Sequence, residues 1–196
     1  MTLDELLDAC RQETDDKEAP QLWSDAEFKF WLNEAEREAC IRARLIEDVS
    51  SAATTVAVTT ATAIYALHAS VLDVLRIEAT LNPGIKLTGW TLTPDKLVLA
   101  TVPLVADTLN LTIVRLPLAD FTAAASTPEI QAHHHRRLVD WALYRAYSKR
   151  DSQTDNPGLA ALHLGQFEQS FGYRQTANVQ RKWRDKRAHV VKFNPL

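Results

Sequence analysis

The spacing of hydrophobic residues changes twice along this chain, from a helical period to a strand period and back. At the start, residues 2–14 place apolar side chains on one helical face, and Thr2 and Glu5 have the spacing of a capping box. The same capping spacing recurs just before residues 25–48, where apolar residues follow at steps of three or four. We therefore expect two N-terminal helices over these ranges, separated by an acidic loop.

The middle of the chain has few charges and alternates with a two-residue period. From Val49 it is rich in threonine, valine and alanine, and it has no acidic residue, lysine or arginine before Asp73. Turn signals near residues 83–84 and 93–95 divide it into short segments. This pattern predicts a small, mostly antiparallel sheet between about residues 54 and 116. Its expected strands lie near residues 56–58, 64–67, 71–81, 87–92, 97–101 and 109–115.

Helical signals return near residue 127. Thr127, Pro128 and Glu129 supply an N-cap, a proline at the first helical position and an acid in the first turn. They predict a helix over about 128–150, and its apolar residues surround more than half of its circumference, so several sides should be covered. A last helix is predicted over 157–172, with a glycine at its end.

Together these patterns predict an α+β protein, with a helical bundle body, an inserted small antiparallel β-domain and an extended C-terminal arm. At 196 residues and 22.0 kDa, the chain is long enough for one sizeable core and an appended lobe. We assign the N-terminal helices of the body to residues 1–50, the β-rich insertion to 51–126, the C-terminal helices of the body to 127–172 and the arm to 173–196.

Composition argues against several classes of protein. No run approaches the roughly eighteen consecutive apolar residues of a membrane span, and the first residues are acidic, so we expect a soluble protein with no signal peptide and no membrane contact. Cys10 and Cys40 lack metal-ligand spacing, and a disulfide scaffold needs more cysteines, so both are expected to be reduced, buried thiols.

Charge is distributed unevenly along the chain. Residues 1–48 contain 14 acidic and 6 basic residues, a net charge of −8, and residues 49–172 have a net charge of −1. Residues 173–196 contain 1 acidic and 7 basic residues, a net charge of +6. An acidic head and a basic tail attract each other, within one chain or between neighbouring copies.

The basic tail combines cations with aromatic rings. Such a segment suits docking on another protein, binding to the phosphates and bases of a nucleic acid, or simple solvation. We favour docking, because exposed aromatic rings need a covering surface. The residues expected to form this docking arm are Arg174, Arg181, Lys182, Trp183, Arg184, Lys186, Arg187 and Phe193.

No pattern for catalysis or cofactor binding stands out. Residues 133–135 are three consecutive histidines, but helical geometry brings at most two of them to one metal ion, so we expect a solvated or interface-facing turn and no metal site. The acids of residues 34–38 are expected on a helix exterior, in ion pairs with nearby arginines. For Asp140 and Asp151, a catalytic role is the alternative to helix capping or salt bridging, which we favour. We therefore predict no catalytic residue and no cofactor.

Three stretches together resemble tailed-bacteriophage head-to-tail adaptor (connector) proteins. They are residues 23–27 leading into 31–39, residues 135–147 with the run LVDWALYRAY, and residues 167–172. The resemblance covers both helical blocks and, loosely, the β segment. Its positions are packing positions. They include Trp23, Phe28, Trp31, Leu32, Leu138, Trp141, Tyr144, Phe167 and Phe171.

The resemblance implies a structural protein of the virion neck, assembled in the host cytoplasm. Such adaptors form a ring, usually of twelve copies, that binds beneath the portal protein, extends the DNA channel and receives a tail or nozzle protein. The helical body would make the ring, the arm would dock on the portal, and the β insertion would face outward or toward the tail. DNA would pass without sequence-specific binding. The alternative is a nucleic-acid-binding accessory protein that uses the basic arm.

Overall fold

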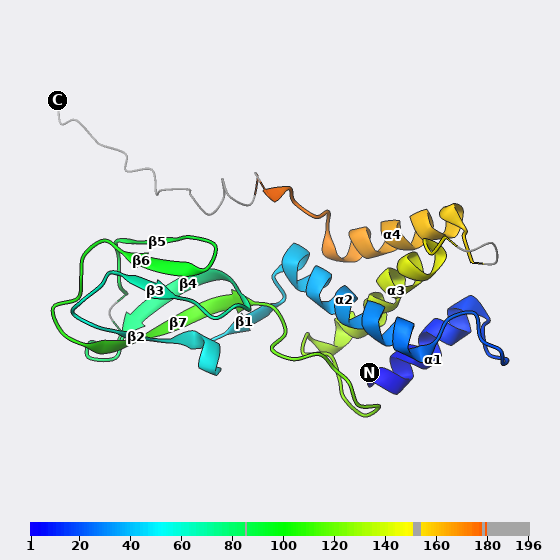
Figure 1. The fold of residues 1–196 in the computed structure, drawn as a ribbon, viewed down its shortest axis with the longest axis horizontal. Helices are drawn as coiled ribbons and strands as arrows, with labels where there is room; N and C mark the ends of the chain where they lie inside the picture. Colours follow the sequence, from blue (N-terminus) through cyan, green and yellow to red (C-terminus); the bar gives the residue numbers. More distant parts are fainter. Residues whose placement is uncertain (85, 151–153, 178, 180–196) are drawn as a thin grey trace.

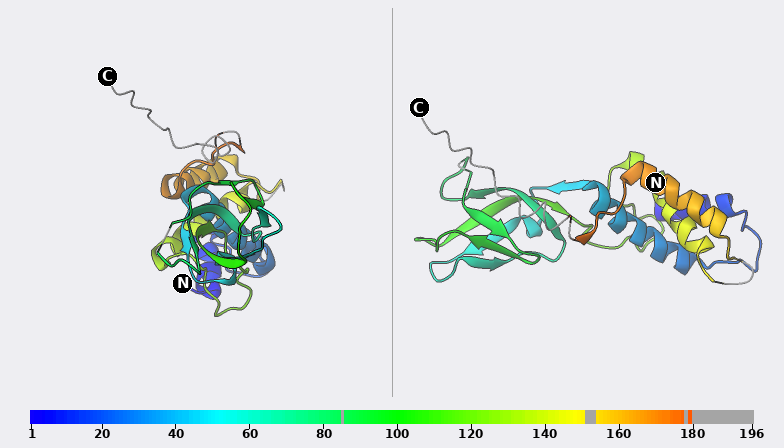
Figure 2. Two further views of the ribbon diagram at one scale, coloured as in Figure 1. Left: turned by 90° about the vertical axis from the view of Figure 1, so that its left-hand side faces the viewer. Right: turned by 90° about the horizontal axis from the view of Figure 1, so that it is seen from above.

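The computed structural model describes residues 1–84, 86–150, 154–177 and 179, and it shows an elongated molecule with two parts (Figures 1 and 2). One part, the helical body, contains the helices from both the N-terminal and the C-terminal parts of the chain. The other, the β lobe, lies beyond the C-terminal end of α2. The body consists of α1 (Leu3–Thr14), α2 (Asp25–Ala43), the 3-10 helix η2 (Ala132–Arg137), α3 (Leu138–Tyr147) and α4 (Pro157–Phe171). This confirms the predicted α+β fold.

Both N-terminal helices begin with the predicted capping boxes. The hydroxyl of Thr2 accepts a hydrogen bond from the backbone N–H of Glu5, whose carboxylate accepts one from the N–H of Thr2. Ser24 and Glu27 make the same reciprocal pair at the start of α2. These bonds satisfy N–H groups that have no partner inside the helix, so each helix start is fixed by local sequence.

The second helix is shorter than the predicted 25–48. It ends at Ala43, and Arg44 adopts a left-handed conformation with φ of 53°. The next residues form strand β1 (Ile46–Asp48), which pairs with the strand that ends at Arg115. The prediction was wrong here because Asp48 forms an ion pair with Arg115 from far along the chain, a contact that local periodicity does not contain.

The regular helix predicted over 128–150 begins ten residues later, at Leu138. The structure has η2 over Ala132–Arg137 and a regular helix only from Leu138 to Tyr147, so Thr127 is not its N-cap. The backbone N–H groups of Glu129 and Ile130, which the prediction placed inside this helix, donate to the carboxylate of Glu36 on α2 instead. A tertiary contact therefore replaces the predicted first turns.

The β lobe contains two antiparallel sheets. Its elements are η1 (Ala52–Thr54), β2 (Thr55–Val58), β3 (Ile64–Ala66), β4 (Val71–Ala79), β5 (Trp90–Leu92), β6 (Lys96–Leu99) and β7 (Asp107–Arg115). In the larger sheet β7 pairs with β1 and β2 on one side and with β4 on the other, and in the smaller sheet β6 lies between β3 and β5. Side chains from both sheets, among them Ile77, Leu97 and Ile113, form one core. The predicted strands are confirmed with small shifts of their ends, and β1 adds one before residue 54.

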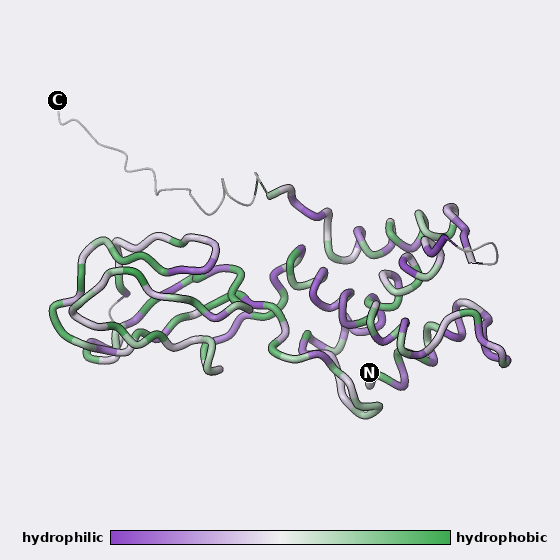
Figure 3. The backbone as a smooth tube through the Cα atoms, viewed as in Figure 1, coloured by the Kyte–Doolittle hydropathy of each residue, from purple (hydrophilic) through white to green (hydrophobic). Residues whose placement is uncertain are grey.

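The helical body has a separate core at the interface of α2 and α3. Both helices present alanines at this interface. Ala35 and Ala39 of α2 and Ala142 and Ala146 of α3 are almost completely buried. Small side chains allow two helix backbones to approach closely. Figure 3 shows the difference between the parts, since the helices alternate between hydrophilic and hydrophobic residues while long stretches of the β lobe are hydrophobic or neutral.

Candidate assembly site

The packing residues in the stretches that resemble head-to-tail adaptors lie together inside the helical body. Eight of the nine predicted packing residues are buried in one core, and Tyr144 packs against its edge. Within this core the Trp141 ring lies 5.0 Å from the Phe167 ring, and the Phe167 ring lies 4.7 Å from the Phe171 ring. These side chains therefore form the core that holds the helical body together. Their predicted part in a ring stays a prediction, and a neighbouring copy would contact the outer faces of this body.

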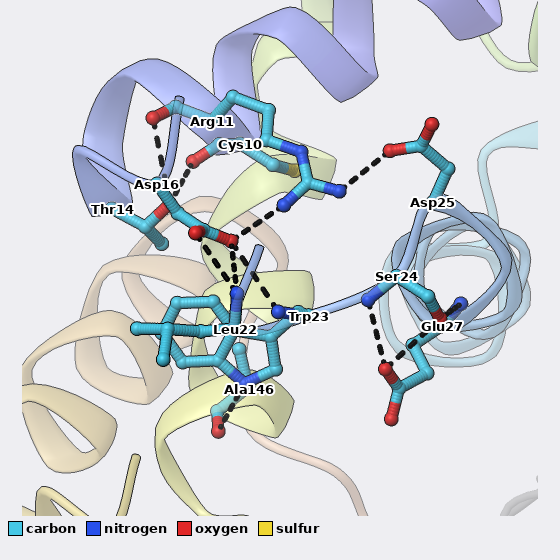
Figure 4. Close-up of polar contacts among 10 residues, drawn as sticks. All are labelled: Cys10, Arg11, Thr14, Asp16, Leu22, Trp23, Ser24, Asp25, Glu27 and Ala146. Carbon is cyan, nitrogen blue, oxygen red and sulfur yellow. Dashed lines mark hydrogen bonds and ion pairs between the residues drawn. The ribbon is translucent and has the colours of Figure 1, made fainter. Parts of the chain in front are cut away.

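The loop between α1 and α2 is held by a buried ion pair (Figure 4). Arg11 on α1 contacts Asp16 at 2.5 Å and Asp25 at 2.6 Å, and its guanidinium lies over the Phe28 ring. The Asp16 carboxylate also accepts hydrogen bonds from the backbone N–H groups of Leu22 and Trp23. This arrangement places the Trp23 ring against the core.

Residues 116–131, which we call the strap, run from β7 back to the body along α2. Three polar residues at intervals of four on α2 bind the strap. The Lys29 ammonium donates to the carbonyl of Thr122 at 2.5 Å. Asn33 exchanges two hydrogen bonds with the backbone of Phe121, and Arg37 forms a 2.7 Å ion pair with Asp120. One face of α2 therefore binds the strap along its length. The side chain of Phe121, in the strap, is buried.

A charged network joins the strap to the β lobe. Arg115 at the end of β7 contacts Asp48 of β1 at 2.5 Å and also contacts Glu129 of the strap. Burial acts to raise the pKa of Asp48, but hydrogen bonds from Ser50, Ser51 and Arg115 hold it well below its usual range. The hydrogen bond from Arg115 likewise lowers the pKa of Glu129. Both carboxylates therefore stay ionised around Arg115, and the charges connect β1, β7 and the strap.

Glu36 and Glu38 correct the expectation that the acids of residues 34–38 lie on a helix exterior. Glu36 is 1% exposed and Glu38 is 7% exposed, whereas Glu34 is half-buried and lies 3.4 Å from Arg145. Burial, opposed by the two backbone hydrogen bonds from the strap, raises the pKa of Glu36 to about 7. The helical pattern gave no sign that Glu36 is buried, because its partners, the N–H groups of Glu129 and Ile130, come from a distant segment.

The start of the arm is fixed to α2 by Glu38 and Arg42. The Arg42 side chain is 5% exposed, contacts Glu38 at 3.3 Å and Glu168 at 3.7 Å, and lies over the rings of Trp141 and Phe167. It donates a hydrogen bond to the carbonyl of Gly172, directly after α4.

The first arm residue predicted to take part in docking binds the same acid. Arg174 donates to Glu38 at 2.7 Å, although the Arg174 side chain is otherwise largely exposed. The docking role of the arm is not tested by this contact. The other predicted docking residues, Arg181, Lys182, Trp183, Arg184, Lys186, Arg187 and Phe193, lie outside the described residues.

The three histidines do not converge on one point. His133 is exposed, whereas His135 is 4% exposed, with Nε2 at 2.9 Å from the carbonyl of Ile130 and Nδ1 at 2.8 Å from the amino group of Met1. The expectation of a solvated or interface-facing turn was therefore wrong for His135. His134 packs on Phe171, and burial lowers its pKa.

The other candidates for chemistry were two acids and two cysteines. Asp140 lies 3.5 Å from His163, and Asp151 lies outside the described residues. Cys10 and Cys40 are free, buried thiols as predicted, and burial raises the pKa of each to about 12. Within the described ranges, the acids, cysteines and histidines form no group of three or more suited to a metal ion. The helices of the same ranges include none long and apolar enough to cross a membrane.

The contacts described above hold the helices, the strap and the start of the arm together within one chain. The family model for the SU10 adaptor protein matches residues 1–190. The chain therefore belongs to the SU10 adaptor family, a family of phage head-to-tail adaptors, as the helical pattern had indicated. A comparison with curated proteins found no match.

Proposed function

We propose that this protein is a structural subunit of the phage neck that assembles into a ring, docks on the portal protein, extends the DNA channel and connects to the tail. The family match over residues 1–190 carries this proposal, because it spans the body, the β lobe and most of the arm. Assembly would take place in the host cytoplasm. No step of this function requires a catalytic residue or a cofactor.

The charge distribution supports a ring of repeated, head-to-tail contacts. Residues 1–48 have a net charge of −8 and residues 173–196 a net charge of +6. A ring is built from interfaces in which two different surfaces of the same chain meet, and opposite charges favour such pairing. Twelve copies are expected by analogy with head-to-tail adaptors in general. The rigid cores of body and lobe would keep the subunit geometry constant around the ring.

The arm is proposed as the element that docks on the portal. Its sequence joins a cluster of cations, residues 181–187, to aromatic residues Trp183 and Phe193. Arginine and aromatic side chains are enriched among residues that dominate binding energy at protein interfaces. The portal would then supply the surface that covers these rings. In this arrangement the β lobe remains available for the tail or nozzle protein.

The proposal is tested by measuring binding to the purified portal of the same phage. Replacing Arg181, Lys182 and Arg184 with glutamine should weaken binding at least tenfold, because three cations at the expected interface are lost. The matched control replaces three exposed cations of the body, Lys17, Arg137 and Arg150, with glutamine, and should bind within about twofold of the unmodified chain. Equal binding by both triple variants would remove the docking role of the arm.

The alternative, nucleic-acid binding by the arm, rests on the same charge of +6. It predicts affinity for duplex DNA that falls steeply as salt increases, since each phosphate contact releases counterions. Fluorescence anisotropy with a labelled duplex between 50 and 200 mM salt, about the range over which such binding changes strongly, separates the two. Negligible binding at the low-salt end would exclude the alternative, whereas strong, salt-sensitive binding without portal binding would replace the docking proposal.

A further inference from the structure

We propose that Glu38 is a positioning residue, which holds the first residues of the arm against α2 and so determines the direction in which the arm leaves the body. This inference rests on the proposed docking function of the arm. It goes beyond that function by assigning a specific contact within the subunit, the ion pair between Glu38 and Arg174, to the orientation of the arm.

The geometry gives the two partners of Glu38 different roles. Arg42 is buried, and it is held by Glu38, Glu168 and two aromatic rings, so it belongs to the body. Arg174 has a side chain that is 58% exposed, and it forms a 2.7 Å ion pair with Glu38. Because Arg42 continues to neutralise Glu38 when Arg174 is absent, loss of Arg174 does not leave a buried charge unpaired. The Arg174 contact is therefore separable from folding.

The same site fixes the backbone just before Arg174. The carbonyl of Gly172 accepts a hydrogen bond from Arg42 at 3.2 Å, and Gly172 has φ of 81°, a conformation that other residues adopt at a cost. The segment after α4 therefore turns away from the helix axis and leads toward the side of the β lobe (Figure 1). Glu38 and Arg42, which lie one helical turn apart on α2, hold this segment through Arg174 and the carbonyl of Gly172.

A fixed starting direction has a direct effect on docking. A tether that is already oriented loses less conformational freedom when it binds, so its affinity is higher than that of a tether with a free start. In a ring, each arm would also leave its subunit at an equivalent place, and all arms would reach equivalent sites on the partner. An ion pair whose arginine is largely exposed is weak enough to adjust when the arm docks.

The first test measures the arm in the free protein. Thr176→Cys is labelled with a nitroxide, which is selective because Cys10 and Cys40 are buried thiols. The label should be slowly tumbling in this background and become mobile when Arg174→Ala or Glu38→Gln is added. The control Arg37→Ala removes an arginine ion pair from the same helix but at the strap, and should leave the label unchanged. A label equally mobile in all four proteins, or equally slow, overturns the inference.

The second test is a double-mutant cycle on portal binding. Arg174→Ala and Glu38→Gln should each weaken binding about two- to fivefold, and the double variant should be no weaker than Glu38→Gln alone, because Glu38→Gln already removes the contact that Arg174→Ala removes. If Arg174→Ala weakens binding and Glu38→Gln does not, Arg174 contacts the portal directly and Glu38 has no positioning role. If the unmodified chain does not bind the portal, the docking function fails, whereas the nitroxide measurement still decides whether Glu38 orients the arm.

Discussion

The carboxylate of Glu36 on α2 accepts a hydrogen bond from the backbone N–H of Ile130, 3.1 Å away, and it accepts a second from the N–H of Glu129. Glu36 and Ile130 are 94 positions apart in the sequence. Their contact fastens the strap to the body at the point where Arg115 fastens it to the β lobe. The stability of this junction is therefore expected to depend on the charge of Glu36.

The stability of the protein should fall between about pH 4.5 and pH 7 because of Glu36. Its pKa is raised from 4.5 to about 7 in the folded protein by burial, so the folded protein binds this proton more tightly than the unfolded chain does. The stabilisation is complete below the unfolded pKa and is lost as the pH rises through the folded pKa, at most about 3 kcal/mol.

The measurement is urea unfolding of the unmodified protein and of Glu36→Gln at pH 5 and pH 8. The stability of the unmodified protein relative to the glutamine variant should decrease at the higher pH. The comparison cancels His134, whose pKa is lowered and which therefore contributes with the opposite sign. An identical pH dependence in both proteins would show that Glu36 does not titrate in this window.

Asp16→Ala should destabilise the protein by about 3 kcal/mol. It removes the buried partner of Arg11 and the acceptor of the backbone N–H groups of Leu22 and Trp23. The adjacent variant Asp15→Asn is the control, because the Asp15 side chain is 92% exposed and asparagine tolerates the left-handed backbone there, and it should change the free energy of unfolding by about 0.5 kcal/mol or less. Equal effects at the two positions would contradict the assigned role of Asp16.

Asn33→Ala should destabilise the protein by about 2 kcal/mol and loosen the strap. The variant leaves the N–H and carbonyl of Phe121, a buried residue, without their side-chain partner. Hydrogen exchange at the Phe121 amide should become faster while exchange in the β lobe core stays unchanged. Arg37→Ala, which removes a half-exposed ion pair to the neighbouring Asp120, should cost less than about 1 kcal/mol.

The two thiols should be unreactive in the folded protein. Cys10 and Cys40 are both 0% exposed, and burial raises the pKa of each thiol to about 12, so almost no thiolate is present at neutral pH. Ellman's reagent should label both only after addition of denaturant. Rapid labelling of either cysteine without denaturant would mean that α1 or α2 separates from the core.

Local sequence predicted the elements that local contacts stabilise. The capping boxes at Thr2 and Ser24 lie beside the helices that they start, and the alternating pattern over 109–115 lies in the strand it forms. Patterns of apolar residues also predicted the core of the body. The β-rich part was recognisable because a sheet with one buried face needs strict alternation.

The errors arose where a distant residue determines the structure. The helix expected to reach residue 48 ends at Ala43 because Asp48 pairs with Arg115, and the helix expected from residue 128 starts late because Glu36 binds the strap. The binding of Arg174 to Glu38 was equally invisible, since the two are 136 positions apart. Periodicity describes which face of an element is apolar, and it contains no information about which charges meet across the fold.

We propose above that this chain forms a ring on the portal, and electron microscopy of the two purified proteins mixed together tests this most directly. We expect complexes in which a ring of this protein lies on the axis of the portal, and we expect these complexes to be lost when residues 173–196 are removed. Images that show neither rings nor complexes with the full chain, or complexes that persist without the arm, would contradict it.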